Sequence, residues 1–427
     1  LIDMGNEVHK GYLADLQSRA HWEKNLDEWT KLALQIREPK STPWANASNV
    51  KYPILATAAM QFSARAYPTL IPSDGQIVHA EVIGSDPQGQ KKERATRISK
   101  FMSYQLMKQM KGWDAAMDRL LIILPVLGTC FKKTFYDSLE GKNCSYLVMP
   151  KDLVVNYWAD CLENAERKTE RIEMSDRILK ERKNAKIFLN VELTKPSLQY
   201  NLNTSIVHKM TPPQEDRTTP YIILEQHTFW DLDDDGYPEP YIITIEESSK
   251  KVLRIVARFD EQGIKQDSEG NLIRIEPIEY YTKYGFIPNP DGGFYDIGFG
   301  LLLGPINAAV NTLVNQIIDS GTIYNLPSGF ISKNLRLKPG DQPLKPGEWR
   351  FVNATGEDLK KGIMTLPDRE PSEVLFQLLG LLIQSSKELA SVAEIFVGKM
   401  PGQNTPATTT MATIEQGMKV FTAIYKR

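Results

Sequence analysis

The sequence predicts an α+β protein in which helices and antiparallel strands occupy different stretches of the chain. Apolar residues recur every three or four positions in long segments near both ends, and they alternate with polar residues in the middle. With 41% hydrophobic and 24% charged residues, the composition is that of an ordinary globular protein. A chain of 427 residues is long enough for two or three hydrophobic cores.

The first part of the chain predicts mainly helices. Residues 12–33 place Trp22, Leu26 and Trp29 on one helical face, and the small-residue segment 54–70 should be a helix that ends before Pro68. The alternation in QIVHAEVIG predicts a strand. Residues 91–121 then predict a long helical region, broken near Gly112. One face of that region should belong to the core and carries Ile98, Met102, Gln105 and Met110.

The middle of the chain predicts strands. The runs GTCFKKTFYD and CSYLVMP, joined by the turn SLEGKNC, predict a β-hairpin, and strands continue around LVVNYW. From Tyr221 onward, β-rich runs separated by turns predict an antiparallel meander. Between these regions, AERKTERIEMSDRILKERKNAK favours a helix with a solvated charged face over a DNA-binding patch. Residues 184–220 are predicted to be irregular.

Two apolar helices dominate the C-terminal part of the chain and should pack antiparallel. The first covers 294–325 and should stop at Gly321, with a buried stripe made of Leu302, Ile306, Val310, Leu313 and Ile317. The second covers 372–397, with Ser372 as its N-cap and Gly398 as its stop. Residues 326–371 between them are rich in proline and glycine, so they favour short strands at 329–333 and 348–352. A loop at 398–406 and a third helix at 407–427 follow.

A polar line runs beside the apolar stripe of the first of these helices. Its members recur at every fourth position, which places them on one helical face: Asn307, Asn311, Asn315 and Asp319. Two interpretations are equally open. The line is either an ordinary exposed helix face, or a surface that meets a neighbouring subunit or the water of a channel.

The C-terminal region resembles the core of tailed-bacteriophage portal proteins, of the type found in short-tailed phages. The resemblance is carried by NAAVNTLVNQIIDSG, by the long apolar helix after it and by NTPATTTMATIEQGMKVFTAIYKR. It implies a portal fold with an α/β wing at 1–293, a stem of two helices at 294–325 and 372–397, and a small clip at 326–371. The resemblance also implies a tunnel loop at 398–406 and a helix at 407–427 that leads towards a crown.

The resemblance also implies a function. A portal is a ring, usually a dodecamer, through which double-stranded DNA enters and leaves the capsid, and it is not an enzyme. Its partners are the terminase large subunit, the major capsid protein and scaffold, and later the tail adaptor proteins. The protein would be assembled in the host cytoplasm and would reside in the virion at the portal vertex, without a membrane.

Further residues receive roles from the same resemblance. The tunnel loop, whose glycines would let it move against DNA, contains Lys399, Met400, Gln403 and Asn404. In the clip, the basic residues that could contact DNA phosphates or acidic partner surfaces are Lys333, Arg336, Lys338, Lys345 and Arg350. For any single clip residue, an ordinary charged loop is the more favoured interpretation.

The motif DLDDDGYPEP resembles the first half of a calcium-binding loop. Asp231, Asp233 and Asp235 offer oxygen ligands at every second position, Gly236 permits the turn, and Glu239 could be a further ligand. The flanking segments predict strands instead of the two helices of an EF-hand. The acidic tip of a hairpin is therefore favoured over a bound Ca²⁺, and a calcium-stabilised structural or adhesion protein is the alternative to a portal.

Other function classes find little support in the sequence. There is no P-loop, no zinc-protease motif and no nucleophile elbow, and the five histidines are scattered. The three cysteines lack metal-ligand spacing and predict buried thiols in a reducing compartment. A net charge of -2 argues against holding nucleic acid by bulk electrostatics, although a weak grip suits a conduit. No apolar run approaches the length of a membrane span.

Overall fold

The computed structural model describes residues 1–42, 44, 47–72, 75–194, 218–268, 272–325, 329–331, 357, 363–365 and 372–389. Among the residues that the structure describes, helices account for 45% and strands for 21%. These contents confirm the α+β class.

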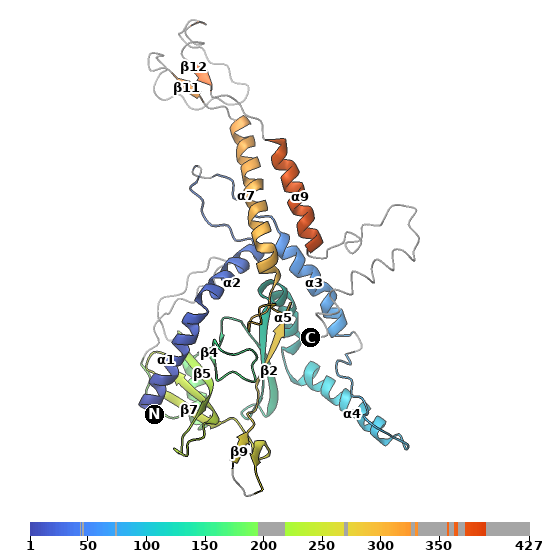
Figure 1. The fold of residues 1–427 in the computed structure, drawn as a ribbon, viewed down its shortest axis with the longest axis vertical. Helices are drawn as coiled ribbons and strands as arrows, with labels where there is room; N and C mark the ends of the chain where they lie inside the picture. The colour runs from blue at the N-terminus through green and yellow to red at the C-terminus, as the bar shows by residue number, and fades with distance from the viewer. Residues whose placement is uncertain are drawn as a thin grey trace. The chain divides into compact units, whose positions relative to one another are not determined.

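The described residues fall into two compact units (Figure 1). The first contains residues 1–36, 53–305 and 387–389, and the second contains residues 37–52 and 306–386. Both larger sheets belong to the first unit. The second unit combines most of the two long helices, α7 (Phe299–Asn325) and α9 (Glu373–Leu389), with a short segment from far upstream in the sequence.

The N-terminal helices are α1 (Ile2–Ser18), α2 (Ala20–Ala33) and α3 (Ile54–Leu70). The single helix expected over residues 12–33 is wrong, because the chain breaks at Arg19. The buried guanidinium of Arg19 donates hydrogen bonds to the carbonyls of Pro150 (3.1 Å) and Leu153 (2.6 Å). The expected end before Pro68 is also wrong. A proline in the last turn removes only one helical hydrogen bond, so α3 continues for two more residues.

A long helical region follows, in three parts: α4 (Gln90–Tyr104), a π-helical turn η1 (Gln105–Gln109) and α5 (Trp113–Leu127). The predicted break at Gly112 is confirmed, and this residue has the positive φ of 84° that glycine tolerates best. Helix α5 packs against α3 and contributes buried leucines to the core. The helix before the break is different, because almost all of it is exposed.

The predicted core stripe on α4 is wrong. Ile98 and Met102 are 41% and 43% exposed, whereas Ser99 and Ser103 are buried. The two serine hydroxyls accept hydrogen bonds from the backbone N–H groups of Ala80 (2.8 Å) and Val78 (3.1 Å) respectively. Because these side chains bind the backbone of residues 78–80, that segment is extended without joining a sheet. The strand expected in QIVHAEVIG is therefore absent from the described residues 75–83.

A five-stranded antiparallel sheet forms the larger layer of the first unit. Its strands are β3 (Leu153–Val155), β4 (Arg167–Met174), β5 (Tyr221–Trp230), β6 (Glu239–Glu246) and β7 (Val252–Ala257), in that order across the sheet. The predicted meander from Tyr221 is confirmed by β5, β6 and β7. One face of the sheet packs against α1, where Val8 and Tyr12 contact a cluster that includes Leu224 and Ile243.

The charge-dense stretch 165–186 departs from its prediction. Only its second half is a helix, α6 (Asp176–Asn184), while the first half is β4, the second of the five strands. Lys168 and Glu170 of β4 are buried in spite of their charge. The helical charge pattern was misleading, because Lys168 is neutralised by Glu279 and Glu170 by Lys133, from distant parts of the chain. Tertiary contacts therefore override the local helical preference.

A three-stranded sheet forms a second layer. Strand β1 (Thr129–Asp137) lies between β2 (Lys142–Val148) and β10 (Tyr281–Gly285), and its pairing with β2 confirms the predicted hairpin. Gly128 before β1 is required, since it has a φ of 86° and a Cβ there would lie 2.3 Å from the carbonyl oxygen of Asp296. A smaller hairpin, β8 (Ile264–Gln266) and β9 (Leu272–Ile275), follows a 3₁₀ turn at Glu261–Gly263.

In the second unit, the two predicted long helices are present with altered limits. Helix α7 continues past Gly321 to Asn325, and α9 begins at Glu373 after Ser372, as its capping position predicts. The buried stripe on α7 is correct at Val310 and Leu313, but Leu302 is 40% exposed. Strand β11 (Gly329–Ile331) pairs with β12 (Ile363–Thr365). The other expected strand, the tunnel loop and the third helix lie outside the described residues.

Candidate functional site

The polar line on α7 is a binding surface for another part of the same chain. We call residues 47–52 the strap, because this extended segment lies along α7. Asn311 Oδ1 accepts a hydrogen bond from the backbone N–H of Tyr52 (2.7 Å), and Asn307 Nδ2 donates one to the Tyr52 carbonyl (3.2 Å). At the other end of the strap, Asp319 Oδ1 accepts the N–H of Ser48 (2.7 Å).

Asn315 makes the most complete set of contacts in this line. Its Oδ1 accepts hydrogen bonds from the N–H of Val50 (2.7 Å) and from the hydroxyl of Ser48 (2.7 Å). Its Nδ2 donates to the Val50 carbonyl (3.1 Å) and to the Asn311 carbonyl (2.7 Å). The side chain thus uses both donors and both acceptor positions of its amide. It pairs with Val50 as the backbone of a neighbouring strand would.

The contacts repeat because two periods coincide. Every second residue of the strap faces α7, and two residues of extended chain span about 6.6 Å. Four residues of a helix span about 6 Å. A helix with an amide at every fourth position can therefore satisfy successive N–H and C=O groups of an extended segment. We call the four residues Asn307, Asn311, Asn315 and Asp319 the amide ladder.

The structure corrects both interpretations of this line. All four side chains are buried, with exposed fractions of 1%, 6%, 7% and 7% in sequence order, so the line is neither an exposed face nor a lining open to channel water. Its members bind a segment about 260 residues away in the sequence. A four-residue amide period was visible in the sequence, but nothing local identified its partner.

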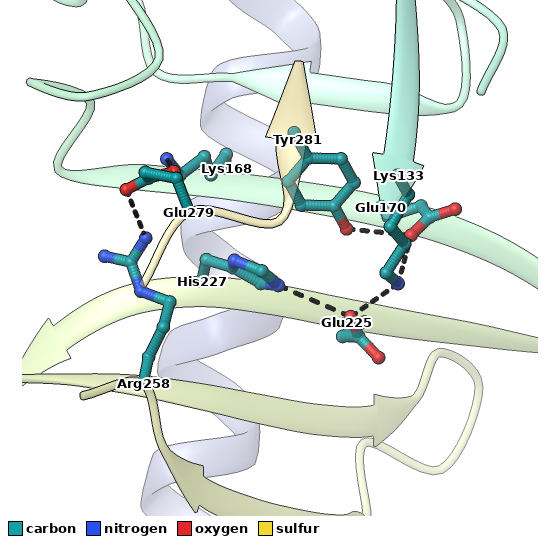
Figure 2. A network of polar contacts seen from close by, with 8 residues as sticks. All are labelled: Lys133, Lys168, Glu170, Glu225, His227, Arg258, Glu279 and Tyr281. Carbon is teal, nitrogen blue, oxygen red and sulfur yellow. Dashed lines mark hydrogen bonds and ion pairs between the residues drawn. The ribbon is translucent and has the colours of Figure 1, made fainter. Parts of the chain in front are cut away.

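A second constellation is a buried ionic network between the two sheets of the first unit (Figure 2). Lys133 Nζ of β1 lies 2.6 Å from Glu170 Oε2 of β4 and 2.7 Å from Glu225 Oε1 of β5. The hydroxyl of Tyr281 on β10 donates to Glu170 (2.7 Å), and His227 Nε2 lies 3.4 Å from Glu225. The network ties β1 and β10 of one sheet to β4 and β5 of the other.

A neighbouring branch holds two more cations on one carboxylate. Glu279 accepts hydrogen bonds from Lys168 and from Arg258, the latter at 2.9 Å. Three carboxylates thus face three cations across the whole network, which balances its formal charge when His227 is neutral. A network so closely matched within itself has no obvious vacancy for a substrate. We interpret it as a structural junction.

Burial and pairing set the protonation states in this junction. Burial alone would lower the pKa of Lys133, but Glu225 and Glu170 together raise it. For Glu225, burial is outweighed by Lys133 and His227, which hold its pKa below its usual range. Burial lowers the pKa of His227 to about 4, because its bond to Glu225 offsets only part of the desolvation. These residues were not among the predicted site residues. The only local signal was a polar run, Glu225 to His227, inside an apolar strand.

The acidic motif forms an exposed turn between β5 and β6. Asp231, Asp233 and Asp235 each place a carboxylate oxygen within 4.8 Å of the others, so one cation could contact all three. The two oxygens of Asp231, however, already accept hydrogen bonds from the N–H groups of Asp235 (3.2 Å) and Gly236 (2.9 Å). Glu239, the fourth expected ligand, is buried at the start of β6 and is not part of this group. The acidic residues thus form hydrogen bonds within the turn, as the hairpin-tip interpretation expects.

The remaining predicted site residues cannot be placed. Those of the clip and of the tunnel loop lie outside the described residues: Lys333, Arg336, Lys338, Lys345, Arg350, Lys399, Met400, Gln403 and Asn404. Their roles stay predictions.

The two long helices have exposed faces without charge. In α7 the only charged side chain is Asp319, which is buried, and Leu301, Ile318 and Ile323 are 46%, 40% and 53% exposed. In α9 no charged residue occurs between Glu373 and Lys387, and its large exposed apolar residues are Val374 (67%), Phe376 (51%), Leu378 (40%), Leu381 (62%) and Leu389 (53%). Faces of this kind on a soluble protein usually mark an interaction surface.

By length and composition alone, α7 is also able to cross a membrane, and 33% of its most apolar window is buried within the protein. The expectation that no segment comes near a membrane span is therefore wrong by this criterion. The criterion is weak, because a core or interface helix also meets it. The amide ladder gives α7 one polar face that is occupied by the strap.

No family model matches this chain, and no curated protein matches it either.

Proposed function

We propose that the protein is a portal subunit, one copy of a ring that forms the channel for double-stranded DNA at a phage capsid vertex. In this proposal α7 and α9 are the two stem helices, and the ring, a dodecamer by resemblance, docks first with the terminase and later with tail adaptors. The subunit performs no catalysis itself. The sequence resemblance in the C-terminal region motivates the proposal.

The single observation that supports it best is the lack of charge on the exposed faces of both long helices. Leu381 and Val374 on α9 are exposed by more than half in the isolated chain. Burying such side chains gains about 25 cal/mol for each Å² of apolar surface. Copies of the same helix pair standing side by side in a ring would bury them. A heterologous interface that repeats around a closed ring satisfies every copy.

The amide ladder changes which residues line the proposed channel. Because the strap covers Asn307, Asn311 and Asn315, these side chains are not available for the lining. The side of α7 away from the strap exposes small and uncharged side chains instead, among them Ala309, Thr312 and Gln316. We propose these residues as lining candidates, since a surface without cations would bind phosphates weakly and allow DNA to slide.

Negative-stain imaging and light scattering of the purified full chain test this proposal. The expected result is a population of annular particles with a central hole and a mass of many subunits. A stable monomer at high concentration, without annular particles, would overturn it. Protein that stays soluble only in detergent would overturn it as well, because α7 and α9 would then face lipid.

The carboxylate cluster at Asp231, Asp233 and Asp235 favours one alternative, a calcium-stabilised structural or adhesion protein. Calcium should then raise the melting temperature of the wild type and leave that of an Asp233→Ala variant unchanged. Equal melting temperatures with and without calcium would remove this alternative.

A further inference from the structure

A large excess of positive charge lies in one exposed helical segment. Residues 90–111, which contain α4 and η1, carry seven basic side chains and one acidic one, a net charge of +6. The whole chain has a net charge of -2, so the remainder carries -8. The basic residues are Lys91, Lys92, Arg94, Arg97, Lys100, Lys108 and Lys111, and all are exposed.

Most of this charge is not compensated within the described part of the chain. Glu93, the single acid of the segment, pairs with Arg97 at 3.2 Å. Among the described residues, Arg94, Lys100, Lys108 and Lys111 form no ion pair. By contrast, the exposed helix α6 pairs its basic residues with its own acids, as in Lys180 with Asp176 at 2.6 Å. The charge of α4 is therefore free to act on something outside the chain.

The exposed surface of α4 mixes basic and apolar side chains. Phe101 and Tyr104 are 56% and 53% exposed and lie on the same side of the helix as Arg94 and Arg97. The opposite side is occupied, because Ser99 and Ser103 bind the backbone of residues 78–80. A helix that lies in a membrane surface separates an apolar face from a basic one. Helix α4 does not, so its charge pattern favours a phosphate backbone over a lipid surface.

We propose that α4 is a binding surface for the phosphate backbone of double-stranded nucleic acid, independent of base sequence. Arg94, Lys100 and Arg97 would make phosphate contacts, and the exposed aromatic side chains would rest against the sugars. Figure 1 draws α4 at the edge of the first unit, away from the two sheets, where a duplex could reach it. This surface is distinct from the proposed channel, and the inference does not depend on ring formation.

The test is a binding titration of the full chain against a fluorescein-labelled 30-base-pair DNA duplex at 50 to 200 mM NaCl. The double variant Arg94→Gln/Lys100→Gln is compared with Arg177→Gln/Lys180→Gln on α6, which removes one arginine and one lysine that have acidic partners. Each phosphate contact adds about 0.9 to the slope of log affinity against log salt. We expect the α4 variant to lower that slope by about 1.8 and to bind about tenfold more weakly or worse, while the α6 variant binds as the wild type.

Three results would overturn the proposal. The first is equal weakening in both variants, or none in either. The second is binding of the wild type to vesicles that contain an anionic phospholipid but not to the duplex. The third is a change in oligomeric state of the α4 variant, measured by light scattering, with unchanged DNA binding, because α4 would then contact another copy. A protein that forms no rings but still loses DNA affinity in the α4 variant would refute the portal and support this surface.

Discussion

At the scale of single residues, the amide ladder shows how a side chain can replace a strand. Asn315 satisfies both polar groups of the Val50 backbone and is itself fully hydrogen-bonded. Its removal would leave a backbone N–H and a carbonyl of Val50 without these partners, in a place that is partly shielded from water. Unsatisfied buried groups cost about 1 to 3 kcal/mol each.

We therefore predict that Asn315→Ala lowers the free energy of unfolding by about 2 to 4 kcal/mol and releases the strap. Hydrogen exchange of the Val50 amide, followed together with urea unfolding, measures both effects. Gln316→Ala removes a neighbouring amide from an exposed position and serves as the control, with a change within about 0.5 kcal/mol. Unchanged protection of Val50 in Asn315→Ala would contradict the ladder.

A second prediction at the residue scale concerns His227 and the dependence of folding stability on pH. Burial lowers its pKa from 6.5 to about 4, and the groups that face it are Glu225, Arg258, Lys133 and the rings of Tyr280 and Tyr281. Between these two pKa values the unfolded chain binds a proton that the folded protein does not. Stability therefore falls as the pH drops from 6.5 to 4, by about 3 kcal/mol from this residue. Above pH 6.5 the residue is neutral in both states and its contribution is constant.

A comparison of wild type and His227→Gln isolates this effect. Asp152 acts in the opposite direction, because burial raises its pKa from 3.8 to about 6, so the folded protein holds a proton there that the unfolded chain releases. We predict that urea unfolding at pH 7 and pH 4.5 gives a steeper loss of stability for the wild type than for the variant. Parallel losses would mean that the histidine is not buried as the structure has it.

At the scale of secondary-structure elements, α9 has two different sides. Leu375, Leu379 and Leu382 are partly covered, whereas Val374 and Leu381 lie on a neighbouring side of the helix and are 67% and 62% exposed. Within one chain these side chains are exposed to solvent, so their apolar character does not stabilise the fold. An apolar side of this kind would be stabilising if another molecule buried it.

We predict that Val374→Ser/Leu381→Ser shifts the protein from the proposed rings to smaller species, as measured by light scattering. The free energy of unfolding of the single chain should change by only about 0.5 kcal/mol, because both side chains are exposed there. Gln377→Ser, at a polar and exposed position of the same helix, should leave the mass unchanged. A mass that stays the same in the double variant would show that this face of α9 is not part of the interface.

At the scale of the whole molecule, charge is distributed very unevenly. A chain that is almost neutral overall contains one strongly basic helix, two long helices with uncharged exposed faces, and a junction in which carboxylates and cations match inside. In our proposals the basic helix binds a polyanion and the uncharged faces contact another copy. The junction lies in a low-dielectric interior, where an unpaired charge is costly. The net charge of -2 gives no indication of this uneven distribution.

The amino-acid sequence by itself determined the elements that depend on neighbouring residues. The hairpin of β1 and β2, the meander from β5 to β7, the break at Gly112 and the start of α9 follow from periodicity, turns and caps. It also identified the acidic turn and the amide period of α7, although not what either one does.

Only the tertiary structure decided where the polar groups find their partners. Lys168 and Glu170 lie in a strand because a carboxylate and a cation from distant parts of the chain neutralise them. The amide ladder is buried because a strap about 260 residues away satisfies its hydrogen bonds. A buried polar side chain is stable only when it is paired. That pairing depends on residues distant in the sequence, so a local pattern shows a polar group without showing whether water or protein will satisfy it.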